Sequence, residues 1–191
     1  ASFELLRETW NGAADLIPRN PNYVKKVVFP LETLPAALLL ANAFHTAANF
    51  AVLYAGMLAL KHTIPLTALL LPLALLPLAL LALAGGFLFS ALGVYIRDIK
   101  QTVALLTTAL FFMSPIFYSV HTVRERIPPI APLIATANPL SHALDAILNV
   151  GVFGLALDWR AYGAVLGLSA AAAFAAFACF RRLRPGFADV M

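Results

Sequence analysis

Four long stretches of the chain contain no charged side chain, and short polar junctions separate them. These apolar runs cover residues 35–60, 64–96, 102–120 and 161–180. A helix of about 20 apolar residues is long enough to cross the hydrocarbon core of a bilayer. In lipid such a run must be helical, because an isolated extended segment leaves its backbone hydrogen bonds unmade. The pattern therefore predicts four membrane-spanning helices.

The second apolar run is too long for one perpendicular span. Its 33 residues would form a helix of about 50 Å at 1.5 Å per residue, whereas the hydrocarbon core is about 30 Å thick. Prolines at positions 65, 72 and 77 supply points where a helix can begin or bend. We expect a helix that starts outside the core, bends near these prolines and ends near Ile96.

The stretch between the third and fourth runs, residues 121–160, is ambiguous. Part of it, residues 140–157, is apolar enough for a fifth span, but His142, Asp145 and Asn149 fall on one face of a helix. A fifth span would also move the basic cluster near the C-terminus to the outer side. We expect short helices that enter the outer leaflet without crossing. Four prolines break them up: Pro128, Pro129, Pro132 and Pro139.

The first residues, 2–17, have the pattern of an amphipathic helix. Such a helix can lie in the membrane interface or form the wet end of a membrane-spanning helix. Its apolar stripe holds Phe3, Leu6, Trp10, Ala13 and Ile17, and its polar stripe holds Glu4, Glu8, Asn11 and Asp15.

The composition agrees with a membrane protein. Hydrophobic residues make up 62% of the chain and charged residues 12%, against about 25% charged in soluble domains. The mean hydropathy is +0.87. The fold class expected is therefore an all-α integral membrane protein, a polytopic bundle of transmembrane helices.

The basic residues predict an orientation, because cytoplasmic junctions of membrane proteins are enriched in Lys and Arg. With the N-terminal segment in the cytoplasm, nine of the 13 basic residues are inside and four are outside. The charges gather at junctions and form no continuous basic face, so a nucleic-acid partner is not expected. The inside set is Arg7, Arg19, Lys25, Lys26, Arg97, Lys100, Arg181, Arg182 and Arg184, and the outside set is Lys61, Arg124, Arg126 and Arg160.

No catalytic constellation is visible in the sequence. There is no phosphate-binding glycine loop, and no histidine stands at metal-ligand spacing from a cysteine or a carboxylate. We expect neither a cofactor nor a metal in this chain. A membrane-embedded glycosyl or acyl transferase would need an acid or base near the membrane face. His142 and Asp145 are the outer candidates, and their pattern favours a structural role.

Two sets of side chains within the runs are candidates for a transport path. Asn42, His45, Thr46 and Asn49 share one face of the first run. They either line a hydrophilic conduit or form hydrogen bonds between helices. The third run holds a group of aromatic residues near its end. They form either an interfacial aromatic belt or an aromatic pore lining for sugars. These residues are Phe111, Phe112, Phe117 and Tyr118.

Two junctions carry the remaining candidates. Residues 20–32, "NPNYVKKVVFPLE", form a basic, aromatic segment between two prolines at the foot of the first run. On its residues alone, this segment is typical of an amphipathic interfacial segment. The second junction, "RDIK", closes the second run. There Arg97 and Asp98 either form an ion pair that fixes a tight turn or lie at a solvated helix boundary.

Five motifs in register resemble one known family, the permeases of ABC transporters that export bacterial polysaccharides such as O-antigen, capsule and teichoic acid. They are "NPNYVKKVVFPLETLP" (20–35), "GVYIRDIKQ" (93–101), "MSPIFYSV" (113–120), "ANPLSHALDAI" (137–147) and "RLRPGFADVM" (182–191). Members of that family have six spans, so the chain is expected to be an N-terminally incomplete permease. Residues 2–17 would then be the cytoplasmic end of the second span.

The resemblance implies a single transmembrane permease domain over residues 1–191. Its expected parts are the end of a preceding helix (1–19), a coupling helix (20–34), three spans (35–120), outer-face gate helices (121–160), and the last span with a cytoplasmic tail (161–191). The coupling helix would fit a cleft in a separate ATPase subunit. Expected contacts with that subunit are Asn20, Asn22, Tyr23, Lys25, Lys26, Val27, Phe29, Pro30, Arg97 and Asp98, and the expected outer gate holds Pro139, His142 and Asp145.

The resemblance also implies partners and a location. The expected partners are the ATPase subunit, which would hold ATP and Mg, a second copy of this chain, and a lipid-linked glycan as substrate. The expected location is the bacterial inner membrane. An alternative with the same fold is a permease that exports a drug or a lipid, for which a closed hydrophobic cavity would be expected in place of an aromatic and polar tunnel.

Overall fold

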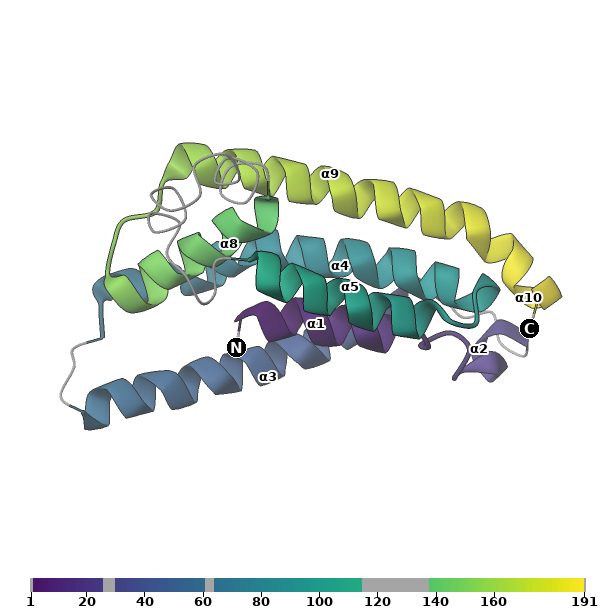
Figure 1. Cartoon of the computed structure of the whole chain (residues 1–191), viewed down its shortest axis with the longest axis horizontal. Helices are drawn as coiled ribbons and strands as arrows, with labels where there is room; N and C mark the ends of the chain where they lie inside the picture. The colour runs from purple at the N-terminus through teal and green to yellow at the C-terminus, as the bar shows by residue number, and fades with distance from the viewer. Residues whose placement is uncertain (1, 26–29, 61–63, 115–137, 191) are drawn as a thin grey trace.

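A computed structural model describes residues 2–25, 30–60, 64–114 and 138–190 (Figure 1). Every regular element in these ranges is helical, which confirms the all-α class. The longer elements are α1 (Ser2–Ala13), α3 (Thr33–Ala59), α4 (Leu71–Tyr95), α5 (Ile99–Met113), α8 (Pro139–Leu148) and α9 (Trp159–Leu183). The short ones are α2 (Pro21–Lys25), η1 (Leu66–Leu70), the π-helix η2 (Asn149–Phe153), η3 (Arg184–Gly186) and α10 (Phe187–Val190).

Three helices in the described part are long and apolar enough to cross a membrane: Thr33–Ala59, Leu66–Tyr95 and Trp159–Gly186. They correspond to the first, second and fourth predicted spans. The third predicted span corresponds to α5, which has 15 residues and is therefore about 22 Å long at 1.5 Å per residue. The last part of that predicted run, residues 115–120, lies outside the described residues.

Helix α4 is the centre of the bundle, and α9, α1, α3, α8 and α5 all pack against it. Its sequence is apolar on every side, which is typical of a helix surrounded by other helices or by lipid. Two prolines of the predicted second run lie where a helix accepts them. Pro65 precedes η1, and Pro72 lies in the first turn of α4. Pro77 lies inside the helix and is buried.

Helix α9 runs parallel to α4 along its whole length. Near the start of both helices, the Tyr162 hydroxyl donates a hydrogen bond to the carbonyl of Leu73 (2.9 Å). Further along, the rings of Phe177 and Phe180 pack edge-on against Phe87, with centroids 5.2 and 5.7 Å away. These contacts fix the register of α4 and α9.

Helix α1 lies inside the bundle, between α3 and α5 and against α4 (Figure 1). Trp10 donates its indole N–H to the carbonyl of Leu81 (3.3 Å). A Cβ atom at Gly85 would collide with that indole, and one at Gly93 would collide with the backbone carbonyl of Ala14. Helix α1 therefore packs as part of the helix bundle, which favours the end of a membrane-spanning helix over a helix lying in the interface.

Residues 138–158 form short helices, as predicted. Helix α8 has ten residues and η2 has five, far fewer than the about 20 residues needed for a span. The side chain of Asn138 caps α8 by accepting a hydrogen bond from the Leu140 amide (3.0 Å). Gly154, with φ of 70°, ends η2 in the left-handed conformation that glycine tolerates. Residues 121–137 lie outside the described part of the chain.

Candidate transport face and cytoplasmic end

The outward side of α1 carries charged side chains level with the middle of α3. The depth is fixed by a hydrogen bond from Asn42 on α3 to Thr9 on α1 (3.1 Å). Ser2, at the start of α1, lines a cavity together with Asn49 of α3. Because α3 has 27 residues from Thr33 to Ala59, positions 42 to 49 occupy its central part. The charged residues of α1 therefore lie on the surface near mid-length of the bundle.

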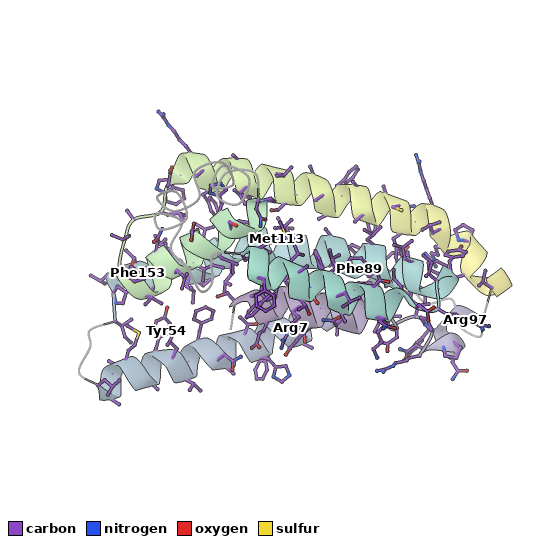
Figure 2. All side chains as sticks on the ribbon, viewed as in Figure 1. Arg7, Tyr54, Phe89, Arg97, Met113 and Phe153 are labelled. Carbon is purple, nitrogen blue, oxygen red and sulfur yellow. The ribbon has the colours of Figure 1, made fainter. Side chains whose placement is uncertain are left out.

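We call this surface the polar face and define it by Glu4, Arg7, Glu8 and Asn11 of α1 with His45 and Asn49 of α3. Arg7 pairs with Glu4 (3.1 Å), and these side chains are 48% and 44% exposed. Asn11 donates a hydrogen bond to the Thr107 hydroxyl on α5 (3.3 Å), so α5 borders the face on one side and α3 on the other. Figure 2 shows Arg7 near mid-length of the bundle, far from the end that carries Arg97.

Arg7 lies near mid-length of the bundle, whereas Arg97, predicted on the same cytoplasmic side, lies at one end of it (Figure 2). A charged side chain at the centre of a bilayer costs about 2.5–3.5 kcal/mol on insertion scales, so such residues face protein or a water-filled cavity. The opposite side of the bundle, on α9, exposes the apolar side chains of Leu168 and Phe174 instead. The bundle thus has an apolar side suited to lipid and a polar face suited to water.

The predicted conduit residues separate into two groups. Asn42 and Thr46 are buried, and Asn42 bonds to Thr9, which favours the alternative of hydrogen bonding between helices. His45 and Asn49 are exposed on the polar face.

The aromatic candidates of α5 are divided as well. Phe111 packs against Phe3 with ring centroids 5.2 Å apart, whereas Phe112 is 67% exposed. Phe117 and Tyr118 lie outside the described residues. Phe112 is therefore the described aromatic residue of α5 that remains open for a lining role.

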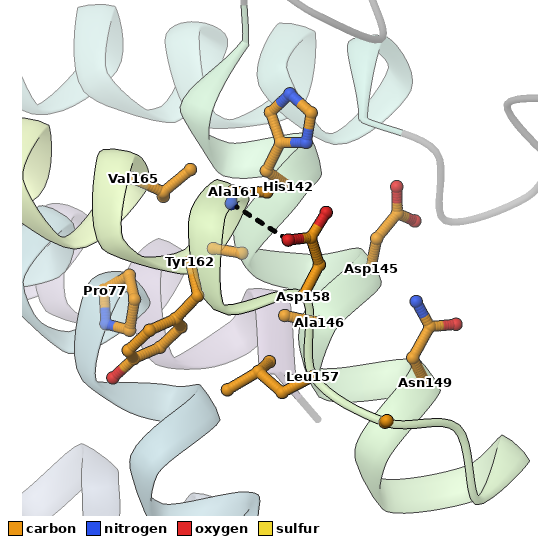
Figure 3. Close-up of a pocket in the computed structure, with 12 residues that line it drawn as sticks. Pro77, His142, Asp145, Ala146, Asn149, Leu157, Asp158, Ala161, Tyr162 and Val165 are labelled. Carbon is orange, nitrogen blue, oxygen red and sulfur yellow. Dashed lines mark hydrogen bonds between the residues drawn. The ribbon is translucent and has the colours of Figure 1, made fainter.

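A cavity of about 210 Å³ lies between α8, α9 and the proline inside α4 (Figure 3). His142, Asp145 and Asn149, the predicted polar face of α8, line one side of it. Asp158 lines the other side and caps α9 by accepting hydrogen bonds from the amides of Arg160 and Ala161 (3.0 and 3.3 Å). Pro139 begins α8 and is not among the lining residues. No cluster of three or more potential metal ligands occurs within the described ranges.

The opposite end of the bundle brings together α2, α10, the end of α4 and the start of α5 (Figure 1). Asp15, just after α1, pairs with both Arg19 (2.9 Å) and Lys100 (2.7 Å). Arg97 and Asp98 are exposed, and no ion pair joins them in the described structure, which favours the solvated helix boundary over the ion pair. The ion pair between Lys100 and Asp15 instead connects the start of α5 to the end of α1.

The structure describes some of the predicted coupling residues and leaves others outside the described ranges. Asn20 donates its side-chain amide to the carbonyl of Leu16 (2.8 Å), and its own carbonyl accepts from the Tyr23 amide (3.2 Å). Asn22, Tyr23 and Pro30 are exposed. Lys26, Val27 and Phe29 lie outside the described residues, as does the side chain of Lys25.

Comparison with known proteins decides the family. Residues 10–151 match the family model described as "ABC-2 type transporter". The chain belongs to this family. It is also similar to the O-antigen export system permease protein RfbA of Myxococcus xanthus, with 22% identity over 178 residues, which is 93% of this chain and 68% of that protein. The protein is therefore a membrane permease subunit of an ABC transporter, and this family implies an ABC ATPase as its partner.

The sequence analysis did not name the charged residues of the polar face as candidates. Glu4, Arg7 and Glu8 belong to the amphipathic stretch that was predicted to be either an interfacial helix or the wet end of a membrane-spanning helix. The apolar stripe beside them is the sequence signal that could have located them. In the structure α1 buries Leu5 as well as Phe3 and Leu6. A helix with that much buried surface in this permease needs helices on several sides.

The cavity beside α8 gives a prediction for the pH dependence of stability. Burial raises the pKa of Asp145, and the nearby His142 lowers it by a smaller amount. A raised pKa means that the folded protein keeps this proton at pH values where the unfolded chain has lost it. Stability therefore falls as the pH rises from the ordinary value of 3.8 through the raised value, and it stays lower above that window.

Replacing Asp145 with Asn is expected to raise the thermal unfolding temperature of the detergent-solubilised permease at pH 7 by a small amount, because the carboxyl is half-buried. The difference from wild type should vanish below pH 3.8. Asp98→Asn changes an exposed carboxyl and serves as the control. An equal effect of Asp145→Asn at pH 7 and pH 3 would contradict the assignment.

Proposed function

We propose that this permease moves a lipid-linked polysaccharide across the bacterial inner membrane as a multi-pass subunit, driven by a separate ATPase that binds ATP and Mg. The observation that carries the proposal is the exposed polar face near mid-length of the bundle. A chain of sugars is hydrophilic and needs a path lined by polar groups or water. The similarity to an O-antigen export permease supports this substrate class.

The composition of the polar face favours a hydrophilic cargo over a drug or a lipid. Glu4, Arg7 and Glu8 provide charged groups, and His45 and Asn49 provide further hydrogen-bonding groups. An apolar cargo would leave these groups without water or partners, which is unfavourable. Phe112, exposed on α5, adds an aromatic surface of the kind that stacks on the C–H side of a sugar ring.

A second copy of this chain is the proposed cover for the polar face. The face is open in the single chain, since Arg7 and Glu8 are exposed. Two such faces turned toward each other would enclose a polar path and leave the apolar side of α9 toward lipid. The carrier of the glycan, by resemblance to the family, is undecaprenyl diphosphate.

Cysteine accessibility tests whether the polar face is hydrated. In a background with Cys179→Ala, which removes the single cysteine, cysteine at His45 or Asn49 is expected to react with a small water-soluble thiosulfonate in membranes. Cysteine at Phe174 is the control, because this side chain is 74% exposed on the apolar side and should meet lipid. Its reaction is expected to be slower by at least about tenfold, since the reagent and the thiolate both need water.

Two results would contradict the proposal. Equal rates at His45 and Phe174 would mean that the polar face does not differ in hydration from the lipid side. Protection of both His45 and Asn49 in membranes, together with full reaction in denaturant, would mean that protein covers this face tightly and that no water-filled path runs along it.

A further inference from the structure

The C-terminal tail is joined to the end of the predicted coupling segment by an ion pair. Arg184, in the first turn after α9, donates to a carboxylate oxygen of Glu32 (2.7 Å). Glu32 directly precedes α3 and therefore marks the point where residues 20–31 enter the membrane-spanning helix. The pair connects positions 152 residues apart in the chain.

The pair is partly shielded from water. The side chain of Glu32 is 19% exposed, and its other carboxylate oxygen is buried without a hydrogen bond to the described residues. Among the described side chains, Arg184 therefore supplies the positive charge that compensates the Glu32 carboxylate. Removing one member of such a pair leaves an uncompensated, partly buried charge, which is far more costly than losing an exposed surface pair.

The tail itself is held firmly against the bundle. Phe187 is completely buried, with its ring 5.6 Å from Phe180 and 6.0 Å from Tyr95. The Tyr95 hydroxyl donates to the carbonyl of Leu183 (2.9 Å). A Cβ atom at Gly186 would meet that hydroxyl, so a larger residue there would displace the Tyr95 side chain from its contact with the tail.

The tail also reaches the coupling segment directly. Helix α10 contacts both α2 and the end of α4, and Figure 1 shows α10 and α2 together at the same end of the bundle. At the other end of the segment, Asp15 pairs with Arg19 and Lys100. Residues 20–31 are therefore bordered by two ionic connections, one to α5 through Asp15 and one to α9 through Glu32.

We infer that residues 184–190 form a clasp that positions the coupling segment for the ATPase, with Arg184 and Glu32 as positioning residues. The inference rests on the proposed role of residues 20–34 in docking the ATPase. A segment anchored at its end to α9 presents one fixed surface to its partner. A displacement that the ATPase imposes on the segment is then transmitted to α9 through the pair, as well as to α3 through the chain.

The test uses the permease co-expressed with its ABC ATPase subunit and purified as the complex. Arg184→Gln is expected to weaken the affinity for the ATPase by about tenfold and to lower the stimulated ATPase activity, because the partly buried carboxylate of Glu32 is left unpaired. Arg184→Lys keeps the charge and is expected to retain most of both. Arg160→Gln removes an exposed arginine near the start of α9, at the other end of the bundle, and should match wild type.

A charge exchange separates positioning from simple stability. Glu32→Arg combined with Arg184→Glu restores an opposite pair and is expected to recover at least about half of the stimulated activity that each single change loses, because the coupling energy belongs to the pair. A double variant that folds like wild type without any recovery would overturn the clasp. Equal activity of Arg184→Lys and Arg184→Gln would overturn it too, whether or not the double variant folds.

Tyr23→Ala separates failure of the clasp from failure of the proposed function. Tyr23 is exposed on α2 and would contact the ATPase directly if this segment docks it. If Tyr23→Ala weakens ATPase binding and Arg184→Gln does not, the clasp is wrong and docking stands. If neither change affects ATPase binding, the docking role itself has failed, and the clasp fails with it.

Discussion

Replacing Lys25 and Lys26 together by glutamate is expected to abolish export and to lower the ATPase activity that the permease stimulates, with membrane insertion unchanged. Both lysines precede the first span, so helix insertion does not depend on them. The same end of the bundle exposes further cations, namely Arg19, Arg97, Arg181 and Arg182. A partner that docks on this basic end is expected to be acidic, and like charges set against each other cost several kcal/mol.

A matched change at the other end of the bundle isolates the effect of position. Arg160→Glu reverses an exposed charge near the start of α9 and should leave ATPase stimulation at the wild-type level. Export is measured as glycan at the cell surface, and stimulation is measured with purified complex. A Lys25/Lys26 double variant that co-purifies with its ATPase and exports normally would show that the segment is a lipid-facing anchor, and the docking role would be dropped.

Phe29→Ala in the same segment is expected to act on assembly more than on turnover. An aromatic anchor in a partner's pocket commonly contributes at least about 2 kcal/mol to binding. Its loss should let the ATPase dissociate during purification in detergent. The two changes therefore separate orientation, which depends on charge, from affinity, which depends on the buried ring.

The membrane-spanning helices could be predicted because lipid leaves little choice. Helices α3 and α9 begin at Thr33 and Trp159, close to the expected positions 35 and 161. A charge-free run of this length must form a helix, and neighbouring elements change that outcome little. The ten-residue length of α8 was also predictable, because its polar face and its flanking prolines both argued against a span.

The position of α1 could not be predicted, because two environments produce the same pattern. An amphipathic helix on a membrane surface and a helix beside a water-filled path both show one apolar and one polar stripe. The contacts that decide between them come from distant parts of the chain, such as Asn42, which bonds to Thr9. The same contact buries Asn42 and leaves His45 exposed, although the sequence places them on one face.

The pair of Glu32 and Arg184 had no signal in the sequence for the same reason. Each residue lies at a polar junction where a charged side chain is ordinary. Their proximity depends on the parallel packing of α4 and α9, which brings the end of α9 beside the start of α3. Long-range ionic contacts of this kind follow from the packing of the bundle and not from local pattern.

Changing Glu4, Arg7 and Glu8 together to leucine is expected to reduce export to less than about a tenth of the wild-type level, because hydrophobic constrictions lose their water and close a polar path. The fold should survive. The apolar side of α1, with Leu5 and Leu6 buried, is not altered, and leucine is a good helix former. Binding of the ATPase should also persist, because the three side chains lie far from the end that carries α2.

The same three residues changed to glutamine provide the matched control. Glutamine keeps the length, the hydrogen bonding and the hydration of the polar face while it removes the charges. If a hydrated surface is what the cargo needs, the glutamine variant should export far better than the leucine variant at equal amounts of folded complex. If both variants fail equally, the charges themselves act on the cargo. If the leucine variant exports normally, other protein covers this face, and the proposed transport path along α1, α3 and α5 is wrong.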